Sequence, residues 1–255
     1  MRTWLATRHS LRVEAASVLA LYAAYEASRG LVAGDRHVAV DHARAVTSFE
    51  RTLHVFAEPS VQHAAQTVPG LLTFLGGAYL TLHLSVTAAL LLWLHQRRPA
   101  AFARVRTTLL IASAIALVGF VVFPTAPPRL ASIGLADTVS GRHVDLNKGL
   151  ISSLYNPFAA VPSLHIGYAL IVGVAIVRFA GARIARIAGF LYSPFVLLVV
   201  VATGNHFFVD AAAGALVGAA AYLVARNIEA RPRPHVQAIP FARLARRQTQ
   251  GKLAA

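Results

Sequence analysis

The hydrophobic residues of this chain are gathered into long runs separated by polar connections. Six runs stand out, at about 11–29, 70–94, 107–124, 163–180, 184–202 and 206–225. A helix needs about 20 apolar residues to cross about 30 Å of hydrocarbon. The first run is the weakest, because Glu14 and Glu26 lie near its ends, but no small-residue cleavage site follows its basic flank. The pattern therefore predicts an all-α, polytopic membrane protein, a bundle of six transmembrane helices.

Two further segments complete the predicted organisation. Residues 36–58 have the pattern of an amphipathic helix, with one face formed by Val46, Phe49, Leu53 and Phe56. We expect this helix to lie in the membrane interface between the first and second spans. The polar loop at 130–162 is long enough to cover a site. We therefore expect one membrane domain at 1–225 and a basic, disordered cytoplasmic tail at 226–255.

Composition and charge favour the same class of protein. The chain is 56% hydrophobic and 13% charged, whereas a soluble domain has about 25% charged residues. The net charge of +14 does not indicate a nucleic-acid partner, because the basic residues lie in the connections and the tail. The segments on one predicted side carry 17 Lys and Arg residues and those on the other carry 7. The positive-inside rule then predicts a multi-pass cell-membrane protein with both termini cytoplasmic, and the excess of Arg over Lys indicates a bacterial sequence.

This topology brings four chemically capable residues to the extracytoplasmic side. Arg129 follows the third span, His165 begins the fourth, and His206 and Asp210 begin the sixth. Polar groups at such helix ends cost less than groups at the bilayer centre. His83, inside the second span, is interpreted as a hydrogen-bonded packing residue. The convergence predicts a site at the outer membrane face.

The predicted helix starts also favour an anion. The first amides of a helix lack intrahelical partners and attract negative charge, and Ser163 and Asn205 are suitable capping residues. Arg129 adds a guanidinium, whose planar fork matches phosphate. We therefore expect phosphate to be bound by Arg129, Ser163 and Asn205.

Spacing suggests different roles for the two histidines. Since His206 and Asp210 are four residues apart, they share a helical face, and the carboxylate can fix the tautomer of the imidazole. His206 is then available as nucleophile or base, and His165 as general acid. A metal site built from His165, His206 and Asp210 is an alternative, although Arg129 would repel the cation. With no cysteine in the chain, thiolate chemistry is excluded.

Three motifs resemble those of the type 2 phosphatidic acid phosphatase superfamily, and more closely its inositol phosphorylceramide synthase-like branch. These are 123–129, 156–165 (Asn-Pro-Phe-Ala-Ala-Val-Pro-Ser-Leu-His) and 203–210 (Thr-Gly-Asn-His-Phe-Phe-Val-Asp); Glu50-Arg51 and Glu58 are also similar to bacterial members. The resemblance implies a six-helix core and metal-free, cofactor-free catalysis. It makes His206 the nucleophile that forms a phosphohistidine, Asp210 its orienting partner and His165 the acid.

The departures from the phosphatase pattern affect the choice of reaction. Val122 and Val200 occupy positions where the phosphatase motifs have Lys and Arg, and Leu164 replaces a Gly. Which basic residue compensates is left open among Arg51, Arg129, Arg142 and Lys148. The transferase branch also lacks some of these cations. The sequence therefore predicts a lipid phosphotransferase with a lipid-phosphate or phospholipid donor and a polyol or lipid alcohol acceptor. The alternatives are a lipid phosphatase, with water as acceptor, and a carrier or flippase for a phosphorylated lipid.

Overall fold

The computed structural model describes residues 35–138 and 156–230, together with isolated positions at 16, 19 and 23. Apart from those positions, the predicted first span lies outside the described residues, as do Arg142, Lys148 and residues 231–255 of the predicted tail. Residues 226–230, also predicted as tail, are instead the last turn of a helix. Within the described part, the chain forms α2 (Arg36–Thr52), α3 (Glu58–Gln66), α4 (Leu71–Arg97), α5 (Pro99–Val122), the 3-10 helix η1 (Pro128–Leu130), α7 (Leu164–Phe179), α8 (Arg183–Ala202) and α9 (Phe208–Ala230).

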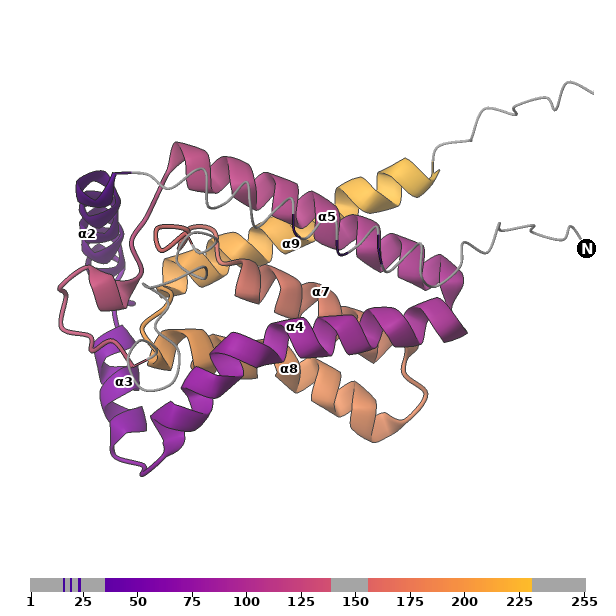
Figure 1. The fold of residues 1–255 in the computed structure, drawn as a ribbon, viewed down its shortest axis with the longest axis horizontal. Coiled ribbons are helices and arrows are strands. Elements are labelled where there is room, and N and C mark those ends of the chain that lie inside the picture. The colour runs from indigo at the N-terminus through magenta and orange to yellow at the C-terminus, as the bar shows by residue number, and fades with distance from the viewer. Residues whose placement is uncertain (1–15, 17–18, 20–22, 24–34, 139–155, 231–255) are drawn as a thin grey trace, which may run out of the picture.

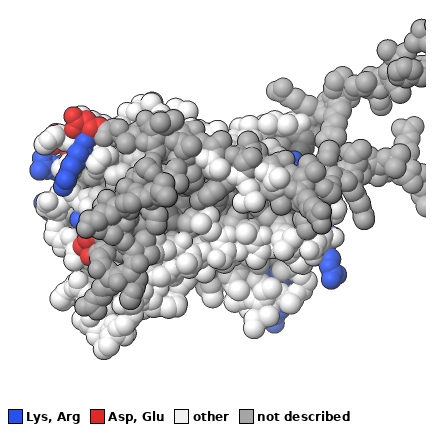
Figure 2. Space-filling model, viewed as in Figure 1, with Lys and Arg blue, Asp and Glu red and all other residues white. Residues whose placement is uncertain are grey.

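The predicted all-helical membrane fold is confirmed, but the number of six spans is not. Among the described residues, four helices, α4, α5, α8 and α9, are long and apolar enough to cross a membrane. The predicted fourth span is α7, an apolar helix of only 16 residues, which corresponds to about 24 Å. It is short because Ser163 caps its start and the chain becomes extended at Ala180. In Figure 2, the described surface visible between the two ends is mostly uncharged, whereas charged side chains lie at both ends.

The central helix of the bundle is α7, which packs against α5, α8 and α9. Small residues let these backbones approach closely, as is common between membrane helices. A Cβ atom on Gly173 would lie 2.6 Å from the carbonyl oxygen of Gly189 on α8. A Cβ atom on Gly214 of α9 would lie 2.1 Å from the carbonyl oxygen of Ser163. The start of α7 is therefore held directly against the first turns of α9.

One end of the bundle is covered by α2 and α3. Figure 1 shows both helices at the end where α7 and α9 begin, while the α4–α5 and α7–α8 connections lie at the opposite end. Backbone hydrogen bonds join the loops of the covered end. The amide of Thr125 donates to Phe158 (2.8 Å), that of Ala126 to Ala39 (3.0 Å) and that of Arg129 to Gly204 (2.9 Å). Segments distant in sequence are thereby fixed around the starts of α7 and α9.

The predicted amphipathic helix at 36–58 is confirmed only in part. It ends at Thr52, and after a turn in which His54 has a φ of 57° a second helix, α3, begins at Glu58. Within the predicted apolar face, Val46 is buried against the protein, whereas Phe49 and Leu53 are 54% and 52% exposed, as expected of side chains that contact the membrane interface. The face of α2 that packs on the protein instead consists of Ala39, Ala43, Val46, Thr47 and Glu50. Small side chains allow close packing there and leave the larger apolar groups toward the surroundings.

Candidate active site

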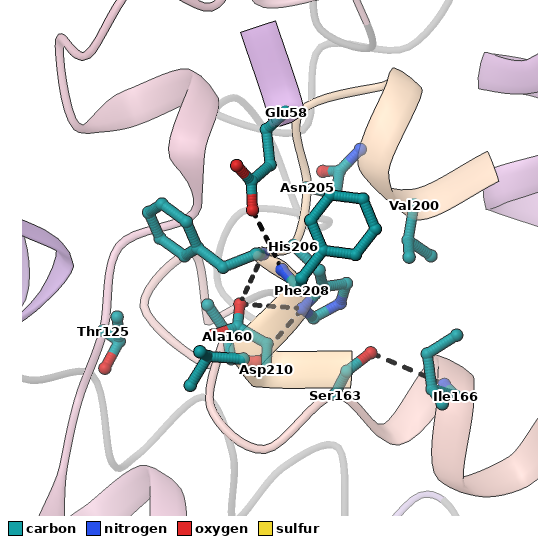
Figure 3. Close-up of polar contacts among 12 residues, drawn as sticks. Glu58, Thr125, Ala160, Ser163, Ile166, Val200, Asn205, His206, Phe208 and Asp210 are labelled. Atoms are coloured by element: carbon teal, nitrogen blue, oxygen red, sulfur yellow. Dashed lines mark hydrogen bonds and ion pairs between the residues drawn. The ribbon is translucent and has the colours of Figure 1, made fainter. Parts of the chain in front are cut away.

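His206 lies in the turn before α9 and is held by two acceptors. Its Nδ1 is 3.0 Å from the carbonyl oxygen of Ala160 and 3.4 Å from Oδ2 of Asp210 (Figure 3). A carbonyl oxygen can only accept a hydrogen bond, so Nδ1 carries the proton. The lone pair of the neutral ring is then on Nε2. Both side chains are buried, His206 at 4% exposure and Asp210 at 0%, so this arrangement is shielded from competing water.

The turn that carries His206 depends on its neighbours in the chain. The amides of Asn205 and His206 both donate to the carbonyl of Val200, at 2.9 and 3.2 Å. Gly204 has a φ of 68°, and a Cβ atom there would lie 3.2 Å from Cβ of Arg129. Glycine is therefore required both for the backbone conformation and for the close approach of η1. This turn fixes the direction in which His206 leaves the backbone.

His165 lies beside His206, as predicted from the topology. Their ring centroids are 5.5 Å apart, with the ring planes tilted by 58°. Ser163 caps α7 as predicted, with its Oγ accepting from the amide of Ile166 at 3.5 Å. The amide of Ser163 donates to the carbonyl of Asp210 at 3.0 Å. The two helix starts are thus linked through the residues that flank the histidines.

A third histidine belongs to the same cluster. His83 of α4 contacts the ring of His165 edge to face at 4.3 Å, and Tyr79 stacks on the same ring at 4.6 Å. The sequence pattern predicts only a packing role for His83. Its separation of four residues from Tyr79 places both on one face of α4, which is the signal that could have connected them. These two rings pack against His165 and restrict its orientation.

Arg129 is buried near this cluster, on η1. Its Nε donates to Oδ1 of Asn205 at 2.9 Å, and its Nη1 donates to Oδ2 of Asp137 at 2.8 Å. The predicted capping role of Asn205 on α9 is therefore incorrect, since its oxygen accepts from Arg129, while its amide nitrogen donates to Oγ1 of Thr203 at 2.8 Å. Asn205 instead joins Arg129 to the turn that carries His206. Phosphate binding by Arg129, Ser163 and Asn205 stays a prediction.

Three carboxyl groups hold the start of α9. The amides of Phe207, Phe208 and Val209 donate to Asp210 (3.0 Å), Glu58 (3.0 Å) and Glu50 (2.7 Å), respectively; Figure 3 shows the contact between Phe208 and Glu58. Glu50 and Glu58 come from α2 and α3 and are both fully buried. In the sequence, these two acids stand out only through the resemblance to bacterial members of the superfamily. The available signal was the position of Glu50, four residues after Val46 and seven after Ala43, on the protein-facing side of α2.

The metal-site alternative has no geometric support in the parts of the chain that the structure describes. Among those residues, no group of three or more His, Asp or Glu side chains could hold a metal ion. His165, His206 and Asp210 accordingly do not form a ligand set. The observed geometry is that of an oriented imidazole with a second imidazole beside it.

The fold and the site together define a class of protein: a helical membrane protein in which a buried His–Asp pair lies at a helix start, with a second histidine beside it. The family model of the PAP2 superfamily matches residues 44–224, which include both helix starts, all of α3 and the second half of α2. The chain belongs to the PAP2 superfamily. Neither the curated proteins nor the solved structures provide a match. Membership indicates an enzyme of the phosphatase or phosphotransferase type that acts on phosphorylated substrates.

Proposed function

We propose that this protein is a membrane-embedded lipid phosphotransferase that works through a phosphohistidine on His206, as in the inositol phosphorylceramide synthase-like branch of its superfamily. The observation that carries the proposal is the fixed tautomer of His206. With the proton on Nδ1 directed at Ala160 and Asp210, the Nε2 lone pair is available for attack on phosphorus. His165, with its ring centroid 5.5 Å away, is close enough to serve the leaving group once substrate lies between the rings.

The reaction proceeds in two displacements. In the first, Nε2 of His206 bonds to phosphorus, the phosphorus–oxygen bond of the donor breaks, and protonated His165 gives its proton to the departing alcohol. Asp210 stabilises the positive charge that develops on the His206 ring. In the second, neutral His165 accepts a proton from the acceptor hydroxyl, whose oxygen attacks phosphorus and breaks the phosphorus–nitrogen bond. Both histidines return to their starting states.

The charges around the site favour a donor that carries one negative charge. Among the described residues, Arg129 is the basic side chain joined to the turn of His206, and it is already paired with Asp137. Three carboxyl groups lie at the start of α9. A phosphomonoester dianion would have to overcome more of this negative charge than a phosphodiester monoanion would. We therefore propose a phospholipid diester as donor and an alcohol, either polyol or lipid, as acceptor.

The membrane supplies the donor and sets the side of the reaction. The site lies at the end of the bundle opposite the basic α4–α5 and α7–α8 connections (Figure 1). By the positive-inside rule, that end is extracytoplasmic. The exposed apolar side chains of α2, Phe49 and Leu53, suit contact with the lipid interface beside the site. We propose that the lipid enters from this outer leaflet.

Transfer from a labelled donor tests the proposal. The purified protein is given phosphatidylinositol or phosphatidic acid carrying radioactive phosphorus, with and without added diacylglycerol or inositol. Movement of label to the added alcohol is expected. Transfer to water, which gives inorganic phosphate from phosphatidic acid or a water-soluble or lipid phosphomonoester from phosphatidylinositol, would instead identify a phosphatase. His206→Ala should lower turnover by about 10⁴-fold or more, whereas His63→Ala, an exposed histidine on α3, should not. Undiminished turnover in His206→Ala would refute the mechanism, and lipid translocation in vesicles that survives this change would favour a carrier.

A further inference from the structure

The interfacial helices reach the reaction centre through two buried acids. Glu50 of α2 accepts a hydrogen bond from the amide of Val209, and Glu58 of α3 accepts one from the amide of Phe208. Asp210 accepts a hydrogen bond from the amide of Phe207, the residue that follows His206. Three successive amides of one helix start are therefore each held by a different carboxyl group. Two of these groups come from elements about 150 residues earlier in the chain.

A helix start favours one negative charge, but three buried carboxylates repel one another. In each of Glu50, Glu58 and Asp210, one buried carboxyl oxygen lacks a hydrogen-bond partner among the described residues. A proton between Glu50 and Glu58 would satisfy one oxygen of each acid and remove one charge. Burial raises the pKa of Glu50 to about 8, and the neighbouring Glu58 carboxyl, which can share a proton with it, and the negative charges of Glu58 and Asp210 contribute further.

The other charged groups nearby do not neutralise this pair. Arg51, the next residue on α2, is exposed and lies over the ring of Phe56 at 5.0 Å. From α9, the groups that face the pair are Asp210 and, through it, His206. Arg129 is directed to Asn205 and Asp137. Within the described surroundings, a proton is therefore the positive charge that can offset the repulsion between Glu50 and Glu58.

We propose that Glu50 and Glu58 are positioning residues of the reaction: as a pair that shares one proton, they hold the first turn of α9 so that Asp210 and His206 keep their reactive geometry. This role rests on the proposed function. Val209 and Asp210 are consecutive, so displacement of the Val209 amide shifts the carboxylate that orients His206. Loss of the shared proton places a second negative charge beside Asp210 and disturbs this turn. The pair thus links the interfacial helices to the nucleophile.

Isosteric and truncated variants separate this role from simple packing. Glu50→Gln keeps the acceptor for Val209 and the donor toward Glu58, and it stays neutral at every pH. Glu50→Ala loses both contacts. Asp41→Asn is the matched control, because Asp41 is an exposed acid on the same helix, paired with Arg44. The probe is bis(p-nitrophenyl) phosphate, whose nitrophenolate leaves without a proton from His165, so that the pH dependence of His165 does not dominate the first displacement.

At pH 6, Glu50→Gln and Asp41→Asn should form the phosphoenzyme at nearly the wild-type rate, and Glu50→Ala should be about 100-fold slower. The loss should be in kcat rather than in KM. Above pH 8 the wild-type rate should fall, while that of Glu50→Gln should not. Equal alkaline losses in the wild type and Glu50→Gln would overturn the proposal, as would a Glu50→Gln enzyme as slow at pH 6 as Glu50→Ala. If Glu50→Ala does not fold, the comparison of Glu50→Gln with wild type still decides.

An infrared titration tests the pair without any turnover. The wild-type protein should show a protonated carboxyl band that disappears near pH 8, and Glu50→Gln should lack it. The melting temperature gives the same information: because the folded protein binds this proton more tightly than the unfolded chain, its stabilisation is present below pH 4.5 and lost as pH rises toward 8. Absence of the band refutes the proton-sharing pair even in an active enzyme. A normal band in an inactive wild type refutes the proposed function alone.

Discussion

Gly214→Ala should separate the two helix starts that form the active site. A Cβ atom at this position would lie 2.1 Å from the carbonyl oxygen of Ser163, whereas ordinary contact begins at 3.4 Å. The obstacle is backbone, so α7 and α9 must move apart by more than 1 Å. Overpacking of this kind costs about 1–3 kcal/mol of folding free energy. A displacement of about 1 Å between reacting groups can lower a rate by about 100-fold.

The matched control is Gly77→Ala on α4, where an added Cβ atom meets nothing within 4 Å. Both variants make the same chemical change in a helix, so the intrinsic effect of alanine on helix formation cancels. Phosphotransfer and thermal unfolding of the purified proteins are measured side by side. We expect Gly77→Ala to match the wild type in turnover and to melt no lower than it, and Gly214→Ala to lose kcat and melt at a lower temperature than Gly77→Ala. Wild-type turnover in Gly214→Ala would show that the close contact between Gly214 and Ser163 is not needed for catalysis.

Two further substitutions test the groups around His206. Asp210→Asn should lower kcat by up to about 10⁴-fold, because an amide cannot stabilise the charged imidazole. The measurement is the single-turnover rate of phosphohistidine formation, and a rate within tenfold of the wild type would contradict the orienting role of Asp210. Arg129→Lys keeps the positive charge but cannot bind Asn205 and Asp137 through separate nitrogens of one planar group, so turnover should fall by about 10²-fold. Wild-type turnover in this variant would show that the positive charge alone is sufficient.

Much of the site could be predicted from sequence because it follows from topology. Two helices that begin on the same membrane face bring His165 and His206 together, whatever the details of their packing. Ser163 could likewise be predicted as a cap, since capping is local chemistry. These positions depend on chain direction and short spacing, which the sequence contains directly.

The contacts that tertiary packing determines could not be predicted in the same way. Asn205 has the chemistry of a cap, but Arg129 approaches it from η1, 76 positions away, and takes its oxygen. The burial of Glu50 depends on where α2 lies across the bundle, and a charged residue in an amphipathic segment is by default assigned to the polar face. The contact between His83 and His165 could not be predicted without knowing which side of α4 faces α7. In each case the deciding partner belongs to another element.

The capping of α9 also changes where the phosphate is expected to bind. Both helix starts were predicted to attract it, but Asp210, Glu50 and Glu58 occupy the first amides of α9. The start of α7 differs, since its cap is the neutral Ser163 and its first turn contains no acid. Its helix dipole therefore stays uncompensated and favours an anion. The phosphate is then expected to lie toward α7 and His165, with α9 supplying the nucleophile rather than the anion-binding amides. This division of roles leaves the His206 side negative and the α7 side positive, which aligns a phosphoryl group between the two rings for displacement.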